Sequence, residues 1–220
     1  MRLALEEAGA EYIDVARERG VNAMMRLLHE STSERVPFAP PFLRAGTLLV
    51  GQTANILQYL GPRLGLMPKA ETHRLWAHQV QLTVEDFIIE IHNTHHPIAS
   101  DLYYHEQKSE ARRRATYFTT ERARQFLLYF EGVLQRNPAG KGWMIGGHLT
   151  YVDLSMFQIM AGLRYAFPKM LERLSPEFRG LLALHDRVAL RPNIAAYLDS
   201  PRRLPFNEDG IFRYYPELDL

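Results

Sequence analysis

The sequence contains no cysteine among its 220 residues. This absence excludes disulfide bonds, thiolate metal sites and any nucleophilic or redox chemistry of cysteine. An excess of charge of one sign is missing too, because 26 lysines and arginines stand against 25 aspartates and glutamates, for a net charge of +1. A near-neutral chain has no strong field to attract nucleic acid or an acidic membrane. Neither is therefore expected as a partner.

Long apolar runs are also missing. Charged side chains fall within the first seven residues, so the N-terminal stretch has no apolar core of signal-peptide length. No later run approaches the roughly 20 apolar residues that span a membrane. We therefore expect a soluble, cytoplasmic protein, and its hydrophobic content of 46% is sufficient for a folded core.

The pattern of apolar residues changes near Pro68. Before this proline, short segments alternate in the order helix (2–8), strand (12–15), helix (21–29), two strands (within 41–50) and helix (53–64). After it, apolar residues recur at helical spacing and no strand is predicted. The sequence predicts an α+β protein with a small mixed domain, residues 1–67, and an all-helical domain, residues 68–220, that ends in a tail from about residue 200.

The stretch FAPPFLRAGTLLVGQTANILQYL, residues 38–60, combines a double proline with the start of a helix. Proline donates no ladder hydrogen bond, so Pro41 must stand at the entrance of a strand, and an X-Pro bond is where a cis peptide forms most readily. Gln52 and Thr53 stand where the next helix begins, and its free N–H groups and positive dipole end favour a carboxylate. Together the two features predict a cleft that binds a ligand.

This stretch and the GPRLGLMP that follows resemble the glutathione-binding half of the cytosolic glutathione S-transferases (GSTs). That half has a strand entered by a cis-proline, a glycine turn, Gln-Ser or Gln-Thr, and an Ile-Leu-x-Tyr-Leu helix. Downstream, GGHLTYVDLSMF resembles the start of a buried helix in the family's helical domain, and RLALEEAGAEYIDV is similar to its first helix and second strand. The resemblance implies the GST fold, a thioredoxin-like domain followed by a helical domain, and a homodimer.

The resemblance also implies that Gln52 and Thr53 hold the γ-glutamyl end of glutathione, which would be the cosubstrate. An ordinary helix cap is the alternative for the two residues, and the surrounding pattern favours binding. In the family, the residue before the cis-proline pairs with the cysteinyl part of glutathione through its N–H and its C=O. Pro40 stands in that place without an N–H, so one hydrogen bond is missing, at a cost on the order of 1 kcal/mol. Weak glutathione binding is expected.

Family members often supply an acidic residue to the amino group of glutathione from the first helix of the helical domain, sometimes across the dimer interface. Asp86, or its neighbour Glu85, stands near that place, and a solvated surface acid is the alternative for both. The same helix ends in EIHNTHHP, where His92 and His96 share a helical face. Because Pro97 ends the helix and no acid completes a zinc pattern, we expect no metal site.

Thr150 and Asp153 have the spacing of a capping box, in which each side chain satisfies an amide at the start of a helix. A catalytic Thr-Asp dyad is the alternative, but no histidine is linked to the pair by the sequence. We assign the two residues, like Pro41, a structural role.

The activity that the resemblance implies is attack of the glutathione thiolate on a small apolar electrophile, helped by a tyrosine or serine hydroxyl that lowers the thiol pKa. In the family, that hydroxyl ends a strand preceding the helix that RLALEEAG resembles. Here Met1 stands directly at that helix, and the strand and its hydroxyl have no counterpart. We expect a truncated form of a longer transferase, nearly inactive by itself. The alternative is a non-catalytic GST-like binding or interaction module.

Overall fold

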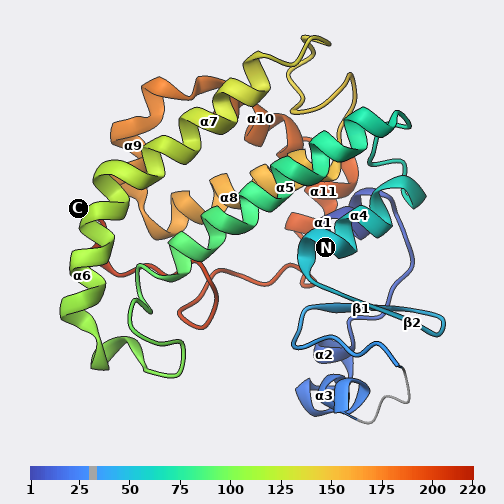
Figure 1. Ribbon diagram of the computed structural model, residues 1–220, viewed down its shortest axis with the longest axis horizontal. Coiled ribbons are helices and arrows are strands. Elements are labelled where there is room, and N and C mark those ends of the chain that lie inside the picture. Colours follow the sequence, from blue (N-terminus) through green and yellow to red (C-terminus); the bar gives the residue numbers. More distant parts are fainter. Residues whose placement is uncertain (30–33) are drawn as a thin grey trace.

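The computed structural model describes residues 1–29 and 34–220, and helices dominate it (Figure 1). The N-terminal elements are α1 (Arg2–Glu7), α2 (Val15–Glu18), α3 (Val21–His29), β1 (Phe42–Ala45), β2 (Leu48–Gly51) and α4 (Thr53–Arg63). The helices that follow are α5 (Glu71–His92), α6 (Lys108–Tyr117), α7 (Ala123–Gln135), α8 (Tyr151–Ala166), α9 (Pro168–Leu174), α10 (Arg179–Ala189) and α11 (Pro192–Leu198). A π-helical turn at Phe118–Arg122 joins α6 to α7.

The hairpin of β1 and β2 lies where the sequence predicts two strands, and β2 extends one residue past the predicted range, to Gly51. The strands pair antiparallel, from Phe42 opposite Gly51 to Ala45 opposite Leu48. Gly46 adopts a φ of 62° in the turn between them, a conformation that glycine takes without steric cost. The predicted helices at 21–29 and 53–64 are confirmed as α3 and α4, and no strand occurs after residue 68 in the part of the chain that the structure describes.

The predicted strand at 12–15 is wrong. The structure gives Tyr12–Asp14 no regular secondary structure, and Val15 already begins α2. A strand needs a neighbour for its ladder hydrogen bonds, and the sheet formed by the described residues contains β1 and β2 alone. Side chains hold the segment instead: the Tyr12 hydroxyl donates to Glu6 Oε1 at 2.7 Å, and Arg2 Nε donates to Asp14 Oδ2 at 2.6 Å.

Helix α8 forms the centre of the helical region. Most of its side chains are buried, and it packs against α5 and α10. Helices α1 and α4 join the same core through Leu3, Ala4 and Leu57. A smaller apolar cluster, made of Leu5, Val50, Ile56 and Leu60, attaches the hairpin to α1 and α4. The N-terminal elements are therefore fastened to the helical region by apolar contacts, and the domain division at residue 68 stays a prediction.

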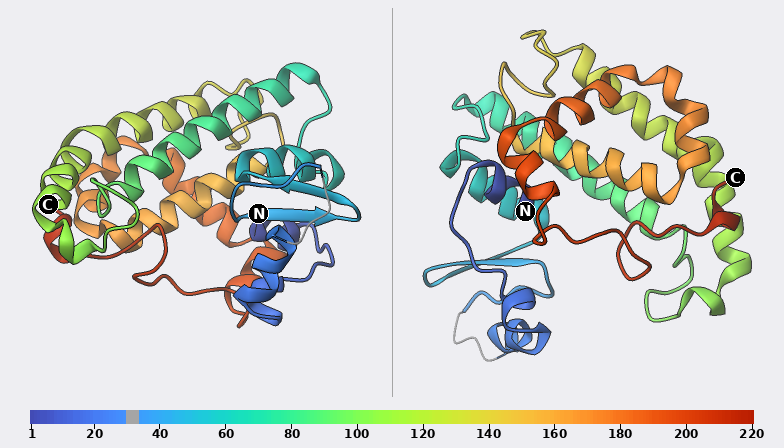
Figure 2. Two further views of the ribbon diagram at one scale, coloured as in Figure 1. Left: turned by 60° about the horizontal axis from the view of Figure 1, so that its bottom comes forward. Right: turned by 180° about the vertical axis from the view of Figure 1, so that it is seen from behind.

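The C-terminal tail, residues 199–220, packs on the helical region from α11 to α6 (Figure 2). The ring of Phe212 covers Gly162 of α8, and the ring of Tyr215 stacks on Tyr104 with centroids 3.9 Å apart. The Asp219 carboxylate accepts hydrogen bonds from the backbone N–H groups of Lys169 and Met170 at the start of α9. Among the described residues, no helix has the length and apolar character needed to cross a membrane.

Candidate functional site

The register of the hairpin brings the two halves of the predicted site together. Phe42 pairs with Gly51, so Pro41 and Gln52 lie next to each other where β1 begins and β2 ends. The peptide bond between Pro40 and Pro41 is cis. Both prolines and Gln52 are exposed, while Thr53 is half-buried. Pro41 and Gln52, eleven positions apart in the sequence, thus form one accessible surface.

The backbone of Gln52 has an unusual conformation, with φ of 66° and ψ of 125°. Among the described residues it is the one non-glycine residue with a positive φ. Such a conformation costs on the order of 1–3 kcal/mol and is typical of sites where a backbone must meet a ligand. The Gln52 carbonyl accepts the first helical hydrogen bond of α4, from Ile56 N–H at 2.8 Å. The strained residue therefore lies directly at the helix start.

The first turn of α4 is open. None of the described side chains caps it, and the Asn55 amide turns back to the Gly51 carbonyl at 3.3 Å. The backbone N–H groups of Thr53 and Ala54 are left without an intrahelical acceptor, as at every helix start. Together with the positive end of the dipole, they make this helix start chemically suited to a carboxylate group.

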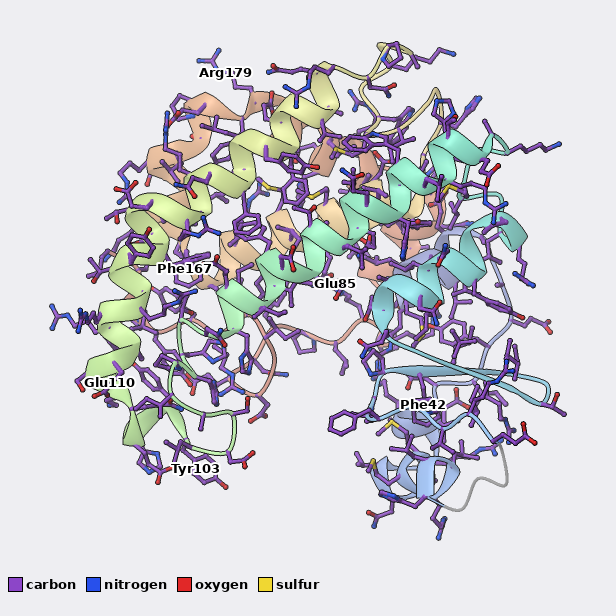
Figure 3. The ribbon with its side chains drawn as sticks, viewed as in Figure 1. Phe42, Glu85, Tyr103, Glu110, Phe167 and Arg179 are labelled. Atoms are coloured by element: carbon purple, nitrogen blue, oxygen red, sulfur yellow. The ribbon has the colours of Figure 1, made fainter. Side chains whose placement is uncertain are left out.

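The two acids of α5 have different environments. Glu85 is half-buried and accepts a hydrogen bond from Gln81 Nε2 at 3.0 Å, and Gln81 in turn accepts one from Ser155 of α8 at 2.7 Å. Asp86 is exposed and makes no ion pair or hydrogen bond with the described residues. Figure 3 shows Glu85 on α5 in the helical region and Phe42 on the hairpin. The structure thus ties Glu85 into the helical core and leaves Asp86 free, but it does not bring Asp86 into contact with Gln52 or Thr53.

The comparisons with known proteins decide the family. Residues 92–201, half of the chain, match the sequence profile of the glutathione S-transferase C-terminal domain. The chain belongs to the glutathione S-transferase family. A glutathione S-transferase of Plasmodium falciparum is 25% identical over 205 residues, covering 90% of this chain and 88% of the relative. Human glutathione S-transferase P is 26% identical over 175 residues, covering 77% and 74%.

Solved structures bear out the fold. Prostaglandin synthase D of Nilaparvata lugens superimposes with a TM-score of 0.67 at 18% identity, covering 93% of this chain and 92% of that one. The predicted α+β GST fold, with a thioredoxin-like part and a helical part, is therefore confirmed. The N-terminal part contains a two-stranded sheet within the described residues.

The histidines of this GST form a contact cluster at the end of α5. His95 is buried, and its Nε2–H donates to the Ile211 carbonyl of the tail at 2.8 Å. Its Nδ1 is then an acceptor for Nδ1–H of His96, at 2.5 Å. Burial lowers the pKa of His95 to about 3, which keeps this ring neutral. The sequence pointed to His92 and His96 and missed His95, whose partner lies 116 residues away in the chain.

Tyr12 is the tyrosine nearest to α1 in the sequence, but its hydroxyl is already engaged. It donates to Glu6, and burial together with this carboxylate raises the pKa of Tyr12. A hydroxyl that stabilises a thiolate must direct its proton toward the sulfur. Tyr12 is therefore unsuited to activate glutathione.

Thr150 and Asp153 form a capping box at the start of α8. Asp153 Oδ2 accepts the backbone N–H and the hydroxyl of Thr150, both at 2.7 Å. Oδ1 accepts the N–H of Met144 at 2.7 Å, so the carboxylate also fastens the preceding loop. Burial raises the pKa of Asp153 to about 6, although the hydrogen bonds act in the opposite direction. All these partners are internal to the fold.

Proposed function

We propose that this chain is a cytoplasmic glutathione transferase whose glutathione site lies at the end of the hairpin. The observation that carries the proposal is the pairing of Phe42 with Gly51, which sets Pro41 beside the open start of α4. The γ-glutamyl carboxylate would bind the Thr53 N–H and hydroxyl, with the Gln52 side chain beside it. The glutathione S-transferases among the relatives support the transferase activity.

The cysteinyl part of glutathione would lie against the cis-proline. The Pro40 carbonyl can accept the cysteinyl N–H, but proline has no N–H to return a second hydrogen bond. The missing bond weakens glutathione binding by about 1 kcal/mol relative to a site that makes both. Both Pro40 and Pro41 are exposed, so a ligand can approach this end of the hairpin.

The reaction would be attack of the glutathione thiolate on a small apolar electrophile. The thiolate forms a carbon–sulfur bond and either displaces a leaving group or adds to a double bond. The free thiol has a pKa of about 8.5, so only a few per cent of it is thiolate at neutral pH. A hydrogen-bond donor must stabilise the anion for fast conjugation. The protein supplies position and electrostatics, and the nucleophile belongs to the cosubstrate.

Thr53→Ala is expected to weaken glutathione binding by roughly 1 to 3 kcal/mol, because a hydroxyl bonded to a charged carboxylate is lost. Isothermal titration calorimetry with glutathione measures the change. Thr47→Ala is the matched control, since Thr47 is an exposed threonine at the other end of the hairpin. Equal affinities of wild type and Thr53→Ala would show that the Thr53 hydroxyl does not contact glutathione and would remove it from the site.

We also propose that two copies of this chain associate, as is typical of the family, and that α5 forms part of the interface. Leu75, Leu82 and Ile89 recur every seven residues on this helix, and their exposed fractions are 63%, 48% and 57%. Such spacing puts them on one face, and exposed apolar stripes of this kind favour association. Asp86 lies one turn from Leu82 and Ile89 on the same face. In such a dimer each Asp86 would face the partner copy. Its carboxylate could then bind the amino group of glutathione held by the partner.

The double variant Leu82→Glu with Ile89→Glu is expected to sediment as a monomer at concentrations where the wild type is a dimer, because four carboxylates would be buried in the interface. Analytical ultracentrifugation measures the mass. Leu190→Glu is the control, because Leu190 is 81% exposed and lies at the end of α10. A monomeric wild type would contradict the proposal.

A further inference from the structure

The middle of the C-terminal tail is attached to the helical region by one hydrogen bond. Between residues 203 and 216, the only hydrogen bond from the tail to the rest of the described chain is the one that His95 Nε2–H donates to the Ile211 carbonyl, at 2.8 Å. The other hydrogen bonds of this segment stay within the tail. Phe206 and Phe212 add apolar contacts with the helical region. His95 is therefore the polar attachment point of the segment.

This tail segment and the loop after α5 lie side by side and enclose a cavity of about 680 Å³ (Figure 2). His96, directly after the attachment point, lines the cavity from the loop. The loop is held by Gln107, which accepts the Ile98 N–H at 2.9 Å and donates to the Ala99 carbonyl at 3.1 Å. One wall of the cavity is thus fixed by side-chain hydrogen bonds, and the other depends on the attachment of the tail.

The facing nitrogens of His95 and His96 have room for a single proton. A carbonyl can only accept, so His95 Nε2 carries a proton, and the Nδ1 of the neutral ring then accepts from Nδ1–H of His96 at 2.5 Å. One added proton can reside on either ring, because His96 can change its tautomer. Two added protons would set the two N–H groups against each other. The pair therefore keeps its hydrogen bond with one added proton and loses it with two.

The surroundings of both rings oppose positive charge. Burial lowers the pKa of His95 to about 3, and nearby positive charge acts in the same direction. This charge belongs to Arg213 of the tail and, when they are protonated, to His92 and His96. Burial and Arg213 also lower the pKa of His96. The carboxylates that line the cavity are those of Asp101, Glu208, Asp209 and Glu217. The further basic groups of the lining are Lys108 and His105.

We propose that residues 203–216 are an acid-released strap, which leaves the His95–His96 pair when both rings are protonated and thereby opens the cavity. The docked tail opposes protonation because it covers His95 and brings Arg213 close to it, and release removes both effects. Attachment of the tail therefore gains stability from His95 above the ordinary histidine pKa of about 6.5, and this contribution is lost as pH falls toward 3. The contacts of Phe206 and Phe212 do not titrate.

A nitroxide label on the tail provides the test. The chain has no cysteine, so Glu208→Cys supplies a single labelling position at an exposed residue of the strap. Electron paramagnetic resonance measures the mobile fraction of the label. From about pH 7 to about pH 4, the equilibrium constant for release is expected to rise on the order of a hundredfold through His95. Far-UV circular dichroism should show that the helices persist over this range.

Variants of the labelled protein identify the responsible group. The amide of His95→Gln can still donate to the Ile211 carbonyl but takes up no proton, so this variant is expected to keep the tail docked at about pH 4. His105→Gln is the matched control: His105 is exposed and lines the same cavity, so release should be unchanged.

His96→Asn decides if His95→Gln does not fold. The asparagine amide can donate to His95 Nδ1 or, turned over, accept from the protonated ring, so release should move to lower pH.

Long-range proton–nitrogen NMR correlation reads the ring protons directly. At neutral pH it is expected to show Nε2–H for His95 and Nδ1–H for His96, and Nε2–H for His96 would overturn the proposal. A label that stays immobile at low pH, release that coincides with loss of the helices, or equal release in the wild type and His95→Gln would also overturn it. None of these measurements involves glutathione, so the proposed transferase function is tested separately.

Discussion

Asp153→Ala is expected to lower the free energy of unfolding by about 3 to 5 kcal/mol, because it leaves three buried donors without their acceptor. These donors are the N–H of Met144 and the N–H and hydroxyl of Thr150. Denaturant melts measure the change. A loss of helix capping alone would cost only about 0.5 to 2 kcal/mol, so the size of the effect distinguishes the two roles. Glutathione affinity per folded molecule should stay unchanged, and a loss of binding without loss of stability would contradict the structural assignment.

The raised pKa of Asp153 predicts that the free energy of unfolding depends on pH. Its pKa is about 6 in the folded protein and about 3.8 in the unfolded chain, so the folded state holds the proton more tightly. The unfolding free energy of the wild type should therefore fall as pH rises from about 4 to about 6, by an amount on the order of 3 kcal/mol from this group. The Asp153→Ala variant has no ionisable group at this position, so this contribution to the pH dependence of its unfolding free energy is absent. The stability difference between wild type and variant should narrow from pH 4 to pH 7, and a difference that widens would contradict the burial of an ionisable group.

Gly61→Val is expected to lower the free energy of unfolding by about 3 kcal/mol, because there is no room for a larger side chain between α4 and α8. A Cβ at Gly61 would lie 2.8 Å from Cδ1 of Tyr151 and 3.2 Å from Cβ of Met67. Tyr151 is fully buried, and its N–H is bonded to the Leu66 carbonyl at 3.0 Å, so the ring cannot withdraw easily. Thermal or denaturant unfolding measures the effect.

Gln58→Val is the matched control for this prediction. Gln58 lies on the exposed face of the same helix, so the variant carries the helix-propensity cost of valine without the steric conflict. It should change stability by only a few tenths of a kcal/mol. Two variants of equal stability would show that α4 and α8 can separate to accept the side chain.

The sequence alone determined the order of the local elements and the chemistry at their ends. Pro40-Pro41, the Ala45-Gly46 turn and Gln52-Thr53 are signals within a few residues of one another, so they predicted the hairpin, the start of α4 and the family together. The Thr150–Asp153 pair was readable for the same reason, since both members belong to one helical turn. Such signals act through local backbone geometry and hydrogen bonding, which neighbouring residues dictate.

The tertiary structure decided those features whose interaction partners lie far away in the chain. Residues 12–15 have the composition of a strand, but a strand forms only where another strand supplies its hydrogen bonds, and these residues are held by side chains instead. Glu85 and Asp86 are equivalent in the sequence, and only the packing of α5 against α8 covers part of Glu85 and leaves Asp86 exposed. The Glu7 carboxylate at the end of α1 accepts a hydrogen bond from Arg191, 184 residues away in the chain. Burial and long-range pairing are properties of the folded chain, because contacts between distant segments create them.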